Sequence, residues 1–99
     1  MSTKVNIQYV GFESKVLVRE YTFLVVEAST PPREFTLTIP HRAFDSHRAR
    51  YQDAAAICLL RLQRELASQS NHPQEKRFKI TDADLADYDR AHTRKAVRR

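Results

Sequence analysis

The residue types best suited to chemistry gather between residues 41 and 50. His41, Asp45 and His47 form the closest grouping of metal-ligating side chains, and on a loop three such residues can converge on one ion. Short polar connectors also carry such residues by chance, and the chain has neither a CxxC nor an HExxH motif. We therefore expect no metal site and no catalytic centre in this segment.

The same segment is basic, with Asp45 as its only acidic residue and with Phe44 and Tyr51 among or beside the cations. Arginine side chains near the start of a helix can bind phosphate groups. The alternative is an ordinary solvated surface, which needs no ligand. The candidates for phosphate contact in this segment are Arg42, Arg48 and Arg50.

A second basic stretch lies at residues 90–99. It contains five basic residues and no acidic one, so the formal net charge of +5 belongs entirely to this stretch. The preceding 89 residues balance twelve basic against twelve acidic side chains. Basic tails often only increase solubility, but some bind nucleic acid. The candidates for phosphate contact in this stretch are Arg94, Lys95 and Arg98.

The other reactive groups favour structural roles. A single glycine cannot build a GxGxxG loop, so no nucleotide cofactor is expected. Cys58 is the only cysteine, which excludes an internal disulfide and favours a small buried side chain. The four aspartates between residues 82 and 89 do not match the EF-hand spacing and suit the start of a helix.

One long helix, expected at residues 48–66, must supply much of the core. Its apolar residues recur at steps of three and four, and neither Gly nor Pro interrupts the chain between Arg42 and Asn71. Asp45 or Ser46 is the expected N-cap. The stripe expected to face the core consists of Tyr51, Ala55, Cys58, Leu59, Leu62 and Leu66.

The opposite side of this helix is also partly apolar, which is unusual for a surface helix. Three explanations stay open. The chain's own C-terminal segment covers this side, a second protein chain covers it, or it is a small exposed patch. The candidate protein interface on this side comprises Ala56, Ile57, Leu60 and Arg64.

Three strands are expected before the helix and one after it. Alternating apolar and polar residues predict strands at residues 4–10, 16–27 and 34–39, and a short edge strand at 77–80. The segment from Gly11 to Ser14 is expected to form the first turn, and Pro31 and Pro32 to end strand pairing in the second. Apolar residues on both faces from Phe23 to Val26 predict that the second strand is central and at least partly covered on both sides.

A second helix is expected from Asp82 to about His92, because Thr81 and Asp84 have the spacing of a capping box. The element order is then β-β-β-α-β-α. This order predicts an α+β fold, in which an antiparallel sheet of three to four strands carries the long helix on one face, with a short C-terminal helix. Residues 1–92 form the single expected domain, and residues 93–99 form a basic tail.

No motif in the chain identifies a function. The leading hypothesis is a non-enzymatic protein–protein interaction module, working either as a homodimer or with a different protein. The alternative is a nucleic-acid-binding module that uses residues 41–50 and 90–99. The longest apolar run is far shorter than the ~20 residues of a membrane span, and the first residues lack the apolar part of a secretory signal. We therefore expect a cytoplasmic protein without a membrane partner.

Overall fold

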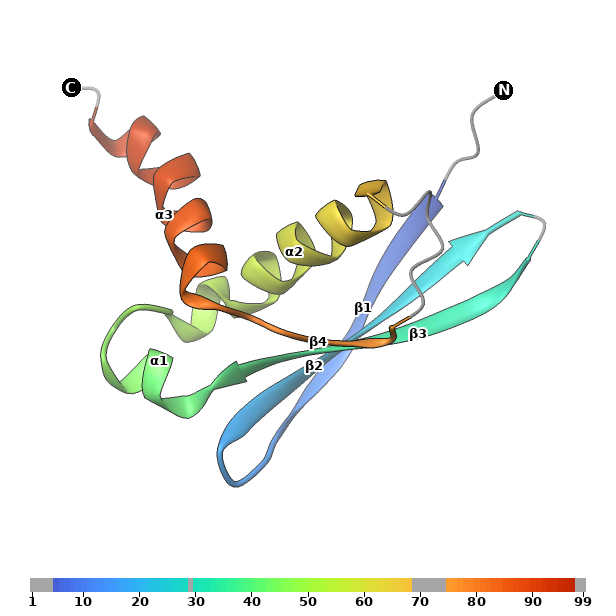
Figure 1. Ribbon diagram of the computed structural model, residues 1–99, viewed down its shortest axis with the longest axis horizontal. Coiled ribbons are helices and arrows are strands. Elements are labelled where there is room, and N and C mark those ends of the chain that lie inside the picture. Colours follow the sequence, from blue (N-terminus) through green and yellow to red (C-terminus); the bar gives the residue numbers. More distant parts are fainter. Residues whose placement is uncertain (1–4, 29, 69–74, 98–99) are drawn as a thin grey trace.

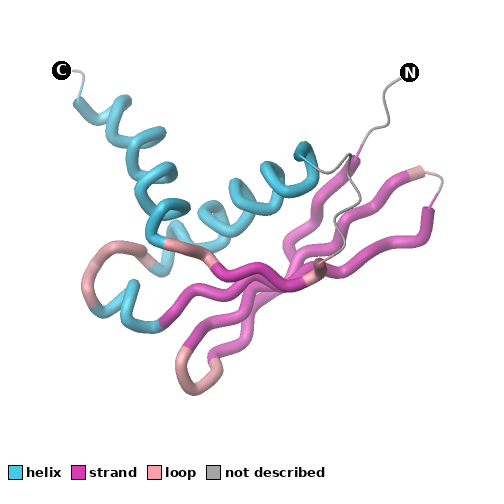
Figure 2. The backbone as a smooth tube through the Cα atoms, viewed as in Figure 1, coloured by secondary structure: helices cyan, strands magenta, loops and turns pink. Residues whose placement is uncertain are grey.

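The computed structural model describes residues 5–28, 30–68 and 75–97, with side chains described as far as residue 91. Its main elements follow the expected α+β order (Figures 1 and 2). In chain order they are β1 (Val5–Ser14), β2 (Val18–Glu27), β3 (Thr30–Pro40), α1 (His41–Asp45), a 3-10 turn (Tyr51–Asp53), α2 (Ala54–Ser68), β4 (Arg77–Lys79) and α3 (Asp82–Val97).

The four strands form one sheet in the order β1-β2-β3-β4. The first three strands are antiparallel, as predicted from their short connections. The fourth strand runs parallel to β3, with Leu37 opposite Phe78. Since α2 carries the chain back along the sheet before β4 begins, the two strands are joined by a crossover and share a direction. The sheet is therefore mixed, with β1 and β4 at its edges.

The core lies between one face of this sheet and α2. Alternate residues of β2 and β3 are buried on that face, and the residues between them in β2, such as Leu24 and Val26, are only half-buried. The second face of β2 is therefore partly covered, as predicted for a central strand. The sheet contributes Tyr21, Phe23, Val25, Phe35, Leu37, Ile39 and Phe78 to the core, and α2 contributes Ala54, Ile57, Cys58, Leu62 and Leu66.

The long helix starts later than predicted. Asp45 and Ser46 end the short helix α1 instead of capping α2, which begins only at Ala54. Tertiary packing explains this difference. Phe44 is buried in the core, and this contact makes the segment before α2 a separate short helix. Tyr51 was predicted to face the core, but it is 61% exposed and stacks on Phe44 with a centroid distance of 4.4 Å.

Two turn predictions also differ from the structure. Gly11 lies inside β1 at a shift of register, with φ +157°, and the turn itself spans residues 15–17. Pro31 and Pro32 lie inside β3, next to a second shift of register between Val25 and Glu27. At that end β4 does not pair with β3, so two residues without an N–H group are tolerated there.

The second helix begins as predicted. The backbone N–H of Thr81 donates to Asp84 Oδ2 at 2.9 Å, and the N–H of Asp84 donates to Thr81 Oγ1 at 3.3 Å, which is the reciprocal pattern of a capping box. The helix continues to Val97, past the predicted end near His92. The backbone of residues 93–97, predicted as tail, is therefore helical.

Candidate functional site

The first notable surface is the outer edge of β1. Within the part of the chain that the structure describes, β1 pairs only with β2, so its other side offers unpaired backbone N–H and C=O groups. No charged residue occurs from Val5 to Phe12. Tyr9, Val10 and Phe12 are 47%, 61% and 53% exposed. We call this strand, Val5–Ser14, the β1 edge.

An arginine holds the aromatic residues of this edge in place. The guanidinium carbon of Arg19 lies 3.9 Å from the centre of the Phe12 ring and 4.6 Å from that of Tyr51. Tyr9 packs on Phe23 with ring centres 5.3 Å apart. A cation on a ring face is stabilising, so this stack orders Phe12 although half of its surface is open to solvent.

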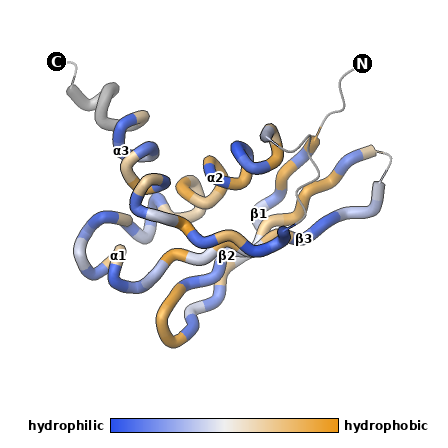
Figure 3. The backbone as a smooth tube through the Cα atoms, in the orientation of Figure 1, coloured by the Kyte–Doolittle hydropathy of each residue, from blue (hydrophilic) through white to orange (hydrophobic). Residues whose placement is uncertain are grey.

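The turn after the β1 edge is tied to the start of α1. The Nε2 atom of His41 lies 2.8 Å from the carbonyl oxygen of Lys15, and the backbone N–H of His41 donates to the carbonyl of Leu17 at 2.9 Å. Val16 and Leu17 between them are 92% and 76% exposed. Figure 3 shows the hydrophobic colour of this turn, which lies outside the β1 edge.

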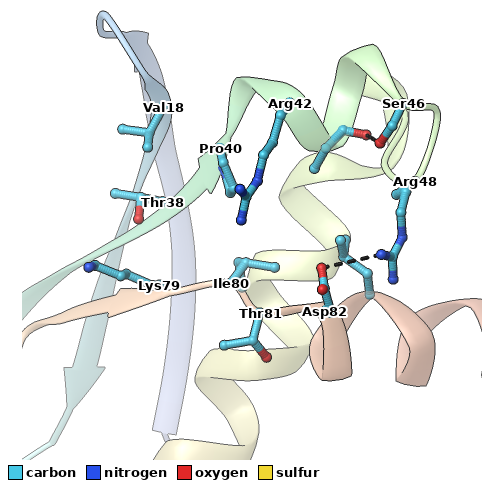
Figure 4. Close-up of a pocket in the computed structure, with 12 residues that line it drawn as sticks. Val18, Thr38, Pro40, Arg42, Ser46, Arg48, Lys79, Ile80, Thr81 and Asp82 are labelled. Carbon is cyan, nitrogen blue, oxygen red and sulfur yellow. Dashed lines mark hydrogen bonds and ion pairs between the residues drawn. The ribbon is translucent and has the colours of Figure 1, made fainter.

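The second notable surface is a cavity of about 750 Å³ at the other side of α1. Figure 4 shows Arg42 reaching from α1 toward Ile80, with Lys79 and Arg48 on either side in that view. We call this cavity the basic groove. Its apolar lining residues are Val18, Pro40, Ala43, Ile80 and Leu85, and its polar lining residues are Thr38, Arg42, Ser46, Arg48, Lys79, Thr81 and Asp82.

The charges around the basic groove are only partly compensated. Arg48 forms an ion pair with Asp82 at 3.3 Å, and Asp82 is the one carboxylate in the lining. Glu20, on the neighbouring strand β2, is bound by Arg77 at 2.8 Å. No residue that the structure describes forms an ion pair with Arg42 or Lys79. The groove therefore carries excess positive charge.

A left-handed residue shapes this groove. The N–H of His47 donates to the carbonyl of Phe44, and that of Arg48 donates to the carbonyl of Ala43, which is the hydrogen-bond pattern of a Schellman motif. His47 takes φ +63°, where glycine is usually found. This sharp turn ends α1 and changes the direction of the chain. Arg48 then faces Asp82 at the start of α3.

The predicted phosphate contacts divide into three groups. Arg42 and Arg48 line the basic groove together. Arg50 is exposed and does not line it. The side chains of Arg94 and Lys95, and all of Arg98, lie outside the described residues. Lys79 was not singled out from the sequence, because a lysine in a short alternating strand indicates only protection of a sheet edge against further pairing. The parallel pairing of β4 with β3 brings it to the groove.

The predicted protein interface on α2 is partly occupied by the chain itself. Ile57 is buried in the core at 3% exposure, and Arg64 donates to Asp87 of α3 at 2.7 Å. Ala56 and Leu60 line a small hollow of about 190 Å³ between α2 and α3. The C-terminal helix therefore covers part of this side, which was one of the three explanations that the sequence left open.

The remaining polar groups have structural partners. Asp84 and Thr81 form the capping box, and Asp87 accepts from Arg64 and Arg90. Those two guanidinium groups, Arg90 first, hold the pKa of the Asp87 carboxyl below its ordinary value. Within residues 5–28, 30–68 and 75–91, no three side chains of His, Cys, Asp or Glu come close enough to hold a metal ion.

The sequence analysis missed the exposed apolar residues of the β1 edge. Phe12 was assigned to a turn because Gly11 precedes it. The signal that could have located it is the apolar alternation of β1, which resumes one residue out of phase after Gly11, as expected at a β-bulge.

None of the helices in the described part of the chain has the length and apolar character needed to span a membrane. Comparison with known proteins gives no further assignment: no family model, no curated protein and no solved structure matches this chain.

Proposed function

We propose that this protein is a non-enzymatic protein–protein interaction module that pairs its β1 edge with the β1 edge of a second copy. Antiparallel pairing of two such edges would join two four-stranded sheets into one continuous sheet. The observation that carries the proposal is a ten-residue edge strand with no charged residue from Val5 to Phe12 and with exposed Tyr9, Val10 and Phe12.

Edge strands of monomeric proteins usually carry protection against pairing. Lysine, proline, short length, a β-bulge or a covering loop are the common devices. The β1 edge has no lysine or proline within Val5–Ser14 and is not short, and the shift of register at Gly11 is the one of these devices that it does carry. Backbone hydrogen bonds across such an edge give affinity, and alternate side chains give specificity. This combination favours pairing with another strand over exposure to water.

The test replaces two exposed, uncharged residues of the edge with lysines. The double variant Gln8→Lys with Val10→Lys should shift the sedimentation equilibrium of the protein from dimer to monomer, because lysines on an edge strand oppose pairing. The matched control is Val16→Lys with Leu17→Lys, which adds the same charge to the exposed turn outside β1. The control should remain dimeric, and both variants should keep the native circular dichroism spectrum. A monomeric wild-type protein at all concentrations would refute the proposal.

A second candidate function is nucleic-acid binding, supported by the presence of Arg42, Arg48 and Lys79 around one groove. Positively charged residues that neutralise phosphates release counterions, so binding should weaken steeply as salt increases. Fluorescence anisotropy with labelled RNA and DNA, at low and at physiological salt, tests this function. Loss of binding in Arg42→Ala with Lys79→Ala would assign it to the folded surface. Binding that survives this double variant would exclude the groove as its site.

A further inference from the structure

We propose that the basic groove is a small-molecule site for a phosphate monoester that carries an apolar or planar body, of about the size of a nucleoside monophosphate. This inference goes beyond strand pairing at the β1 edge and concerns a different surface. Its basis is the combination of excess cations, an apolar floor and a suitable volume in one cavity.

Size and lining favour a small organic ligand over a bare ion. A volume of about 750 Å³ falls within the range of roughly 300–1,000 Å³ that is usual for small-molecule sites. Val18 and Pro40 are only half-buried and offer an apolar surface that inorganic phosphate would leave uncovered, whereas Ile80 and Leu85 are buried in the core. A ligand with an apolar or planar group covers this surface and removes it from water.

The cations favour a phosphate as the ligand's polar end. Arg42 comes from α1, Arg48 from the segment after it, and Lys79 from β4, so cations from three separate parts of the chain line the groove. In Figure 4 the Lys79 side chain extends away from the two arginines. A phosphate monoester has three terminal oxygens and can accept from more of these donors at once than a two-oxygen carboxylate can. Arginine donates in a planar fork that matches phosphate oxygens.

The existing ion pair between Arg48 and Asp82 defines a further expectation. In the structure, Asp82 holds the Arg48 guanidinium at 3.3 Å and also places a negative charge in the groove lining. A phosphate ligand must compete with this carboxylate for Arg48 and is repelled by it. Replacing Asp82 with asparagine removes both effects, so Asp82→Asn should bind the ligand more tightly than the wild type does.

The experiment is an amide NMR titration of the full chain with 1-naphthyl phosphate, and with 1-naphthol and inorganic phosphate as partial probes. The expected result is a set of shifts at groove residues such as Arg42 and Ile80, with affinity at least about tenfold higher for 1-naphthyl phosphate than for either partial probe. If 1-naphthol bound as tightly as 1-naphthyl phosphate, the phosphate group would contribute nothing and the site would be only an apolar hollow. Equal affinity for inorganic phosphate, or shifts spread over the whole basic surface, would mean unspecific charge attraction. Either result would overturn the proposal.

Variants separate the groove from charge in general. Arg42→Gln should weaken binding of 1-naphthyl phosphate by about tenfold or more, because it removes a charge-assisted contact. The matched control is Arg50→Gln, an identical change of charge at an exposed arginine outside the lining, which should leave the affinity nearly unchanged. An equal effect of the two substitutions would contradict the assignment to the groove.

Two further probes distinguish the sources of such a phosphate. Adenosine monophosphate represents a free nucleotide, and a short single strand with a 5′-phosphate represents the end of a nucleic acid. Binding of either probe that is lost in Arg42→Gln supports the site and identifies the source. If neither of these probes nor 1-naphthyl phosphate binds, the proposal is refuted, whatever the oligomeric state of the protein.

Discussion

Arg61 of α2 donates a hydrogen bond to Asp84 of α3 across 2.6 Å, and the two side chains are only 20% and 10% exposed. Asp84 also accepts from the backbone N–H and the hydroxyl of Thr81. One carboxylate thus completes the capping box of α3 and joins α3 to α2. Because α3 lines the basic groove at Asp82 and Leu85, this pair also positions one wall of that groove.

Asp84→Ala should lower the free energy of unfolding by about 2 kcal/mol, because it removes the ion pair that joins α3 to α2 and the carboxylate half of the capping box. Arg61 keeps its contacts to Glu65 and to the Lys79 carbonyl. Urea unfolding followed by circular dichroism measures this loss. Asp87→Ala is the control on the same helix, where the lost contacts to Arg64 and Arg90 are more exposed. It should cost far less. Equal losses in the two variants would contradict a central role for the Arg61–Asp84 pair.

His47→Gly should stabilise the protein by about 1 kcal/mol, because His47 occupies a left-handed conformation that glycine adopts without strain. Thermal unfolding measures the change. Arg50→Gly is the matched control. Arg50 has φ −106° and ψ 145°, an extended conformation that any residue adopts. Glycine therefore relieves no strain there and only increases the conformational entropy of the unfolded chain. That control should be destabilised. A loss of stability in His47→Gly would show that its side chain contributes more than its backbone costs.

Tyr21 is predicted to limit stability at high pH. Burial raises the pKa of Tyr21 to about 12, from an ordinary value of 10.0. The folded state therefore keeps the phenol proton in a pH range where the unfolded chain loses it, and stability contributed by the neutral phenol falls between pH 10 and pH 12. The slope approaches about 1.4 kcal/mol per pH unit. Urea unfolding at several alkaline pH values measures it.

Tyr21→Phe isolates this effect from the other tyrosines. The Tyr21 hydroxyl is buried and has no hydrogen-bond partner among the described residues. Its removal should leave stability at neutral pH unchanged or slightly higher, and should remove the part of the alkaline loss that Tyr21 causes. A large loss of stability at neutral pH would mean that the hydroxyl makes a favourable contact.

Cys58 should be unreactive in the native protein. Its side chain is fully buried, and burial raises the pKa of its thiol above the ordinary value, so the reactive thiolate is scarce at neutral pH. Labelling with iodoacetamide, followed by mass spectrometry, should be slow in native buffer, where only the small unfolded population reacts, and quick in urea. Rapid labelling without denaturant would show that the core around Cys58 opens locally.

The elements of this fold were largely predictable because each carries a local signal. The capping box at Thr81 and Asp84 located α3, and alternation located β2 and the centre of β3. The long helix was found, but its first turns were not, because Phe44 inserts into the core and breaks the segment into α1 and α2. Periodicity within one helix carries no information about such a distant contact.

The candidate sites were harder to predict because they depend on strand neighbours. The exposed edge of β1 follows from sheet order, which no local pattern specifies. Lys79 joins Arg42 only because β4 pairs with β3 in parallel, after a crossover through α2. Arg42 and Arg48 were identified by their charge and spacing, whereas Arg50 shares both properties and lies outside the groove.

Pairing along the β1 edge is tested most directly by hydrogen exchange of the β1 amides at low and at high protein concentration. In the monomer, the outward amides of Val5–Ser14 exchange quickly, because they have no partner strand among the described residues. The proposal predicts that alternate β1 amides become protected as concentration rises, while amides of β4 at the opposite edge do not change. Protection that stays constant at all concentrations, or that rises at β4 instead, would contradict it.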